Sequence, residues 1–72
     1  MHVHTVRTRF TFGDRVRYSS THYREGGIGT VFAICFDASG YIDYLVTPDG
    51  RDGELLGGVA EDEMTLLTDH ST

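Results

Sequence analysis

Short segments of alternating hydrophobic and polar residues recur along this chain, and such alternation is typical of half-buried β-strands. The longest apolar run, residues 26–36, is rich in β-branched and aromatic residues and has glycines at its start, which predicts the central strand of the fold. Residues 15–18 alternate and predict an earlier strand with Val16 facing inward. Residues 41–47 predict a later strand whose inward side chains are Ile42, Tyr44 and Val46.

The remaining segments predict short connections and two further strands. Residues 37–40 form a hairpin loop in which Gly40 takes positive φ. Residues 54–59 predict a short strand broken by two glycines, and residues 60–64 predict a helical or 3₁₀ turn with acids at its start. A last short strand contains Met64, Leu66 and Leu67. The prediction is therefore an all-β fold, a single five-stranded barrel with one short 3₁₀ or helical turn before the last strand.

The central run cannot alternate strictly. Val31 and Ile34 are three positions apart, so both face inward only if the strand contains a bulge or a strong coil, or if both of its faces are covered. Phe32 and Phe36 then become candidates for an exposed apolar patch and a possible oligomer interface. Cys35 is expected to be a small buried hydrophobe, and before this run Phe12 is expected to cap one end of the barrel.

The length of 72 residues predicts one domain with a thin margin of stability, because such a chain buries only about 60% of its unfolded surface. Residues 1–9 are expected to form an arm or an edge strand, residues 10–68 the barrel, and residues 69–72 a polar tail. A single cysteine excludes an internal disulfide and fits a reducing compartment. Neither a signal peptide nor a membrane span is expected, so the predicted location is the cytoplasm. This compact style also resembles products of phages or mobile elements.

Charge is distributed unevenly along the chain, whose net charge is −5. Residues 1–24 hold five arginines against one acid, whereas residues 25–72 hold one arginine against ten acids. The asymmetry fits a basic face for nucleic acid, an acidic face for a basic partner, or attraction within the fold or across a homo-oligomer. For Arg15 and Arg17, which share the outer face of their strand, a carboxylate on another strand such as Asp43 is the expected partner.

The polar segment 19–25 is too long for a tight hairpin and predicts a surface loop, and loops on rigid scaffolds often carry function. Tyrosine and arginine are frequent anchors at interfaces, although Tyr23 would alternatively fold back over the core. With the loop at 49–54 beside it, this segment gives the following candidate residues for binding a protein partner: Tyr18, His22, Tyr23, Arg24, Asp49, Arg51 and Asp52.

No catalytic residue, cofactor or metal is predicted. His2 and His4 share one face of an extended arm, but a third ligand is not close to them in the sequence. Asp49, Asp52 and Glu54 do not have the spacing of a calcium-binding loop. The carboxylates cluster in turns, which gives no pair suited to general acid and base catalysis.

The sequence resembles SH3-like barrels over roughly residues 10–67. The resemblance rests on Phe12-Gly13-Asp14-x-Val16, Gly27-x-Gly29-x-Val31-x-x-Ile34, Tyr44-x-Val46 and Glu61-x-Glu63-Met64-x-Leu66-Leu67. The Gly-x-Val-x-x-Ile portion is similar to the KOW motif of ribosomal proteins and transcription elongation factors. That similarity implies binding to RNA or DNA, with Tyr18 or Tyr23 stacking on bases. The arginines expected to contact the phosphates are Arg7, Arg9, Arg15, Arg17 and Arg24.

The segment at residues 12–17 also resembles the start of type II dihydrofolate reductases, which are tetramers of SH3-like barrels with an active site in a central pore. That family builds its pore from a Val-Gln-Ile-Tyr strand, and residues 56–59 read Leu-Gly-Gly-Val here. The reductase chemistry is therefore not expected, while a homo-oligomer with a pore for a small molecule stays an alternative. The favoured reading is a non-catalytic protein–protein adaptor, with nucleic-acid binding as the second hypothesis.

Overall fold

The computed structural model describes residues 1–67 and shows one antiparallel β-sheet with a single 3₁₀ turn. The elements are β1 (Arg15–Tyr18), β2 (Gly27–Phe36), β3 (Ile42–Pro48), β4 (Leu56–Ala60), η1 (Glu61–Glu63) and β5 (Met64–Leu66). This confirms the predicted all-β fold of five strands with a 3₁₀ turn before the last one. The predicted tail at residues 69–72 lies outside the described residues.

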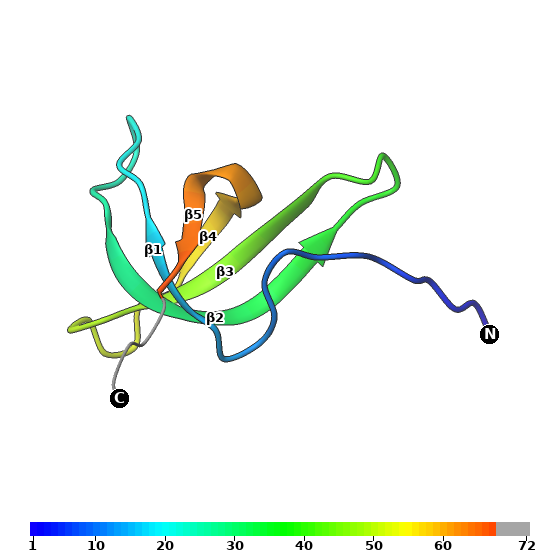
Figure 1. The fold of residues 1–72 in the computed structure, drawn as a ribbon, viewed down its shortest axis with the longest axis horizontal. Coiled ribbons are helices and arrows are strands. Elements are labelled where there is room, and N and C mark those ends of the chain that lie inside the picture. Colours follow the sequence, from blue (N-terminus) through cyan, green and yellow to red (C-terminus); the bar gives the residue numbers. More distant parts are fainter. Residues whose placement is uncertain (68–72) are drawn as a thin grey trace.

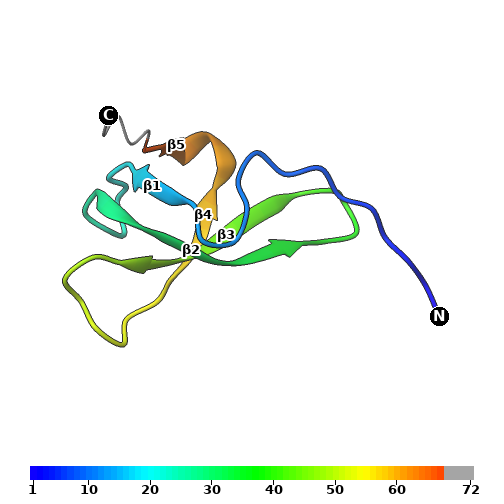
Figure 2. The same ribbon diagram turned by 60° about the horizontal axis from the view of Figure 1, so that its bottom comes forward.

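The strands follow the order β4-β3-β2-β1-β5, so β4 and β5 lie at the two edges of the sheet. The hydrogen bonds between described residues do not join these edges, and closure of the sheet into a barrel stays a prediction. β2 runs through the centre and is long and strongly curved (Figure 1). Its first four residues pair with β1, and residues 29–36 pair with β3. Residues 1–9 form no strand, and the arm extends away from the sheet in both ribbon views (Figure 2).

A bulge in β2 resolves the irregular spacing of its apolar residues. Val31 lies opposite Val46, whereas Ala33 lies opposite Leu45, so the register shifts by one residue between them. The shift lets both Val31 and Ile34 face the core, which was one of the predicted solutions. It also turns Cys35 outward, so the prediction of a buried Cys35 was wrong and its thiol is exposed.

One face of the sheet carries the hydrophobic core. Eight residues from all five strands and the segment before β1 are buried together: Phe10, Val16, Tyr18, Val31, Tyr44, Val46, Val59 and Met64. The ring of Phe10 meets the ring of Tyr44 edge-on, with centroids 5.6 Å apart. The prediction that Phe12 caps the core was therefore wrong, because Phe12 is 65% exposed. A turn that is closed by a hydrogen bond from Asp14 N–H to Thr11 O points it to solvent.

Candidate functional site

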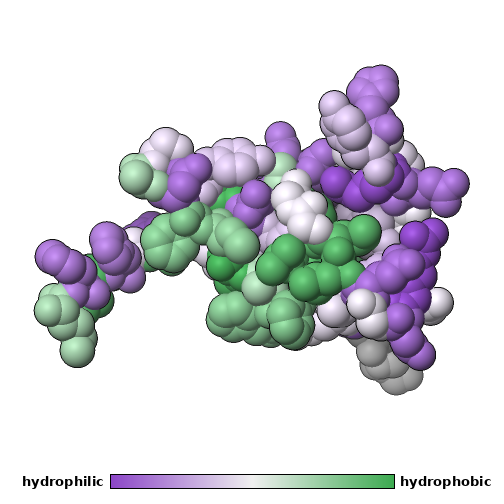
Figure 3. Space-filling model, turned by 180° about the vertical axis from the view of Figure 1, so that it is seen from behind, coloured by the Kyte–Doolittle hydropathy of each residue, from purple (hydrophilic) through white to green (hydrophobic). Residues whose placement is uncertain are grey.

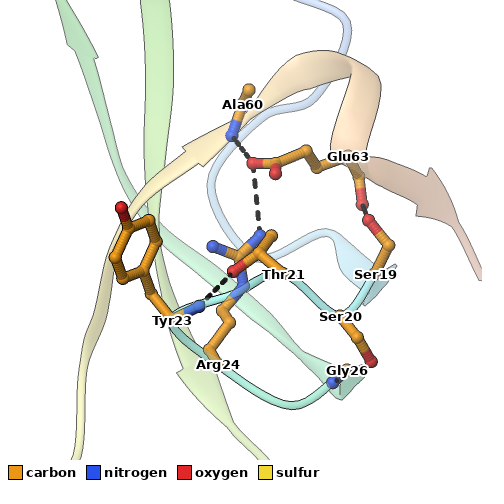
Figure 4. Close-up of polar contacts among 8 residues, drawn as sticks. All are labelled: Ser19, Ser20, Thr21, Tyr23, Arg24, Gly26, Ala60 and Glu63. Carbon is orange, nitrogen blue, oxygen red and sulfur yellow. Dashed lines mark hydrogen bonds and ion pairs between the residues drawn. The ribbon is translucent and has the colours of Figure 1, made fainter.

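Hydrogen bonds within the chain hold the β1–β2 loop, the predicted partner-binding loop, in a defined shape (Figure 4). The N–H of Thr21 donates to the carbonyl of Arg24 at 2.9 Å, and the N–H of Tyr23 donates to Thr21 Oγ1 at 3.1 Å. At the base of the loop, the N–H of Gly26 donates to Ser20 Oγ at 2.9 Å. Each of these bonds satisfies a backbone donor within the loop, which restricts its conformations.

Arg24 fixes the loop to the other end of the chain. Its Nη2 lies 3.2 Å from Glu63 Oε1, and its guanidinium lies over the ring of Tyr18 at 5.9 Å. The same carboxylate oxygen accepts the N–H of Ala60 at 2.9 Å. The hydrogen bond from Ala60 lowers the pKa of Glu63, and the ion pair with Arg24 lowers it further. The Arg24 side chain is only 15% exposed, so its main role is to position the loop.

The Tyr23 side chain points away from this network and is 96% exposed (Figure 4). Tyr23 does not fold back over the core. Of the two roles predicted for it, the role of an interface anchor is therefore the one that stays open. Tyr23 lies on the rim of a groove of about 520 Å³, here named the loop groove. The residues that line the loop groove are Tyr18, Tyr23, Arg24, Glu25, Gly26, Arg51 and Leu56. Buried Tyr18 and half-buried Leu56 give it an apolar wall, while Arg51 and Glu25 supply charge.

The structure divides the seven predicted partner-binding residues into two groups. Four of them line the loop groove, namely Tyr18, Tyr23, Arg24 and Arg51. His22 is exposed on the same loop but does not line the groove. Asp49 and Asp52 line a separate hollow of about 440 Å³ under the β3–β4 loop.

The predicted basic surface is reduced by ion pairs within the chain. Arg15 forms a two-pronged pair with Asp49, with Nη1 at 2.7 Å from Oδ1, and Arg24 pairs with Glu63. Of the five predicted arginines, Arg7, Arg9 and Arg17 form no ion pair with the described acids. The prediction that Asp43 would pair with Arg15 was wrong. Arg15 lies opposite Thr30, which is near the end of β3 that leads to Asp49, whereas Asp43 lies at the other end of that strand.

Phe32 and Phe36, the predicted oligomer residues, are both exposed but belong to different surfaces. Phe32 lines the hollow under the β3–β4 loop. Phe36 lies beside the N-terminal arm, with its ring centroid 6.3 Å from that of His4. The bulge between Val31 and Ala33 causes this separation, because it puts Phe36 on the same side of β2 as Ile34.

A second polar contact ties the core to the 3₁₀ turn. Tyr44 is fully buried, and its hydroxyl donates a short hydrogen bond to Glu61 Oε2. The same oxygen accepts the N–H of Arg9 at 2.8 Å. Burial and the hydrogen bond to Glu61 raise the pKa of Tyr44 to about 12. The two hydrogen bonds from Arg9 and Tyr44 lower the pKa of Glu61.

These shifts predict that the fold loses stability in both acid and alkali. The pKa values of Asp49, Glu61 and Glu63 are lower in the folded state than in the unfolded state, where they are 3.8 for Asp49 and 4.5 for the two glutamates. These carboxylates therefore contribute to the free energy of unfolding above those unfolded values, and the contribution is lost as the pH falls below them. The pKa of Tyr44 is raised from 10.0 to about 12, so its contribution is lost as the pH rises through that interval. Urea unfolding across the pH range should show both losses. A Tyr44→Phe variant that kept the same alkaline loss would contradict the assignment to Tyr44.

Sequence reasoning missed three residues of this site. Glu63 was grouped with the other acids of the turn as a favourable helix-dipole charge, whereas its side chain reaches back three residues and accepts the N–H of Ala60. Leu56 was not assigned to the groove, because the fold brings strand β4 beside the β1–β2 loop and nothing local in the sequence indicates that contact. Glu25 lies in the predicted loop but was not named among its binding residues.

Residues 1–67 offer neither a cluster of metal ligands nor a membrane-spanning helix. No group of three or more His, Cys, Asp or Glu side chains in that range is arranged to hold a metal ion. The same range contains no helix long and apolar enough to cross a membrane.

Comparison with protein-family models, with curated proteins and with solved structures finds no match to this chain. The resemblances to SH3-like barrels, to the KOW motif and to type II dihydrofolate reductases therefore stay predictions.

Proposed function

We propose that this chain is a non-catalytic protein-binding module that holds a segment of its partner in the loop groove. The observation that carries the proposal is that the Tyr23 side chain is 96% exposed, although hydrogen bonds and an ion pair hold the rest of its loop in place. Tyrosine is enriched among the residues that dominate binding energy at interfaces. Since the fold makes no use of this ring, partner binding gives it a role.

The shape of the loop supports the proposal. Binding orders flexible side chains and loops at a cost of about 0.5–1.5 kcal/mol for each immobilised side chain. Here the pair of Arg24 with Glu63 and the hydrogen bonds of Thr21 and Ser20 order the loop before a partner arrives. A partner would therefore meet a largely formed surface, with Tyr18 and Leu56 as an apolar wall.

The groups with shifted pKa values serve the fold in this structure. Groups with strongly perturbed pKa values in a cleft are candidates for catalytic roles. Among residues 1–67, the groups with shifted pKa values are Arg15, Asp37, Tyr44, Asp49, Glu61 and Glu63. All six lie outside the lining of the loop groove, where they satisfy ion pairs and hydrogen bonds of the fold.

Selection of peptides from a random display library against the wild-type protein tests the proposal. We expect an enriched peptide class whose binding, measured by fluorescence anisotropy, weakens by at least about 30-fold in Tyr23→Ala, as for an interface hot spot. Tyr41→Ala is the matched control, because Tyr41 is also exposed but does not line the groove. Its affinity should stay within about two-fold of wild type, since isolated surface contacts contribute little.

The fold of Tyr23→Ala should be unchanged, because the ring makes no core contact and the N–H of residue 23 keeps its bond to Thr21. Amide shifts in an NMR titration with the selected peptide should centre on residues 19–26 and 51–56. Failure to enrich any peptide class, or equal affinity of the Tyr23 and Tyr41 variants, would overturn the proposal.

A further inference from the structure

The outer face of the sheet carries an apolar surface that the core does not use. Phe32 follows buried Val31 and is 61% exposed, so its ring points away from the core. Leu45 lies between buried Tyr44 and Val46 and therefore also faces outward. Leu55 is exposed and lines the same hollow as Phe32. These three residues are named the outer apolar face.

Gly57 on β4 keeps this surface flat beside Leu45. A Cβ atom at Gly57 would lie 3.1 Å from Leu45 Cδ2, so Gly57 faces the same side of the sheet as Leu45 and adds no side chain beside it. Hydrophobic side chains accordingly gather in the middle of the face seen in Figure 3, between the N-terminal arm and the β3–β4 loop. An apolar patch bordered by polar residues on a small domain marks an interaction surface.

The charges around this face suit a second copy of the same chain. The molecule has a net charge of −5, which opposes most contacts between copies. Beside Phe32 and Leu55, however, Asp49 pairs with Arg15 and Glu54 pairs with Arg51. Two copies related by a two-fold axis would therefore bring mixed charges together at the rim rather than acids alone.

The small size of the core also favours association with a second copy of the chain. Within residues 1–67, eight buried residues and three partly buried ones form the core, and chains of this length frequently gain stability by oligomerisation. We propose that the outer apolar face is the interface of a two-fold homodimer, in which the Phe32 ring of each copy covers the hollow beside Leu55 of the other. Two exposed apolar residues and the half-buried Leu45 are fewer than an interface of about 800 Å² per partner requires, so we expect the dimer to be weak and reversible.

Sedimentation analysis from micromolar to millimolar concentration tests this proposal. The wild-type chain should shift from monomer to dimer, and Phe32→Asp should weaken association by at least about 30-fold, as expected for a hot spot. Leu55→Asp is the second variant and should act in the same way. Phe12→Asp is the matched control, because Phe12 is equally exposed at 65% but lies on the turn before β1, and it should associate like wild type.

Cys35 provides an independent readout, because the described chain holds it as an exposed thiol on a strand of this sheet. A spin label on Cys35 should give a defined distance between copies, and that signal should vanish when labelled protein is diluted with unlabelled protein. A wild-type monomer at millimolar concentration would overturn the proposal and assign the face to a different partner. Association that Phe32→Asp and Leu55→Asp leave intact would overturn it as well. Tyr23→Ala should leave association unchanged, which separates this interface from the loop groove.

Discussion

Gly29→Ala is expected to lower the free energy of unfolding by about 3 kcal/mol or more, the largest effect of any single methyl group added to this fold. Gly29 is buried in β2 opposite Pro48. A Cβ atom there would press on the carbonyl oxygen of Thr47 and approach Val46 Cγ1 at 2.8 Å. Backbone in the middle of a paired sheet cannot yield without breaking its hydrogen bonds, so β2 and β3 would have to separate.

Gly57→Ala is the matched control for this prediction. It adds the same methyl group to a strand of the same sheet, but the methyl group meets only the tip of a flexible leucine. Thermal unfolding should place Gly57→Ala within about 1 kcal/mol of wild type, because alanine also suits a strand better than glycine does. Equal unfolding temperatures for the two variants would contradict this prediction, because they would mean that the space between β2 and β3 at Gly29 can hold a methyl group.

Glu63→Ala is expected to destabilise the fold by about 2–3 kcal/mol, because one carboxylate oxygen serves two donors. The substitution leaves the N–H of Ala60 without its acceptor and leaves the charge of Arg24, which is mostly shielded from solvent, without its partner. This value lies below the range for a fully buried ion pair, because the Glu63 side chain is 29% exposed.

The same substitution should weaken peptide binding in the loop groove, since Arg24 no longer fixes the loop that carries Tyr23. Glu54→Ala is the control for stability, because Glu54 forms an exposed pair with Arg51 at 3.4 Å, and such pairs contribute less than about 1 kcal/mol. Tyr41→Ala is the control for peptide binding, because Arg51 itself lines the loop groove and Tyr41 does not. Urea unfolding and peptide titration provide the measurements. Unchanged stability of Glu63→Ala would contradict the anchoring role of this carboxylate.

Most of the fold follows from the sequence because strand alternation and turn residues are local signals. The bounds of β1 were predicted as found, and those of β2 and β3 within one residue. The positive φ of Gly40 also follows from its hairpin position. The prediction for Cys35 failed because the bulge after Val31 shifts the register, and the prediction for Phe12 failed because the turn closed by Asp14 N–H and Thr11 O points its ring to solvent.

The candidate site was less predictable, since its residues come from segments far apart in the chain. Tyr23 was singled out from loop position and residue type, which are local properties. The anchoring of Arg24 by Glu63 depends on a contact across 39 positions. The pairing of Arg15 with Asp49 spans 34 positions, and a partner at that distance is chosen by the strand register and not by charge alone.

The pairing of β1 with β5 has a consequence for how the chain is made. Val16 lies opposite Leu66, so the first strand finds its outer neighbour only in the last described segment. During synthesis, the backbone groups on one side of β1 therefore stay unpaired until residues 64–66 have left the ribosome. A stalled or clipped chain that ends before Met64 would keep that edge open, and open edges recruit other strands. Fragments that end before Met64 would therefore present the edge of β1, which β5 covers in the folded sheet, to other chains.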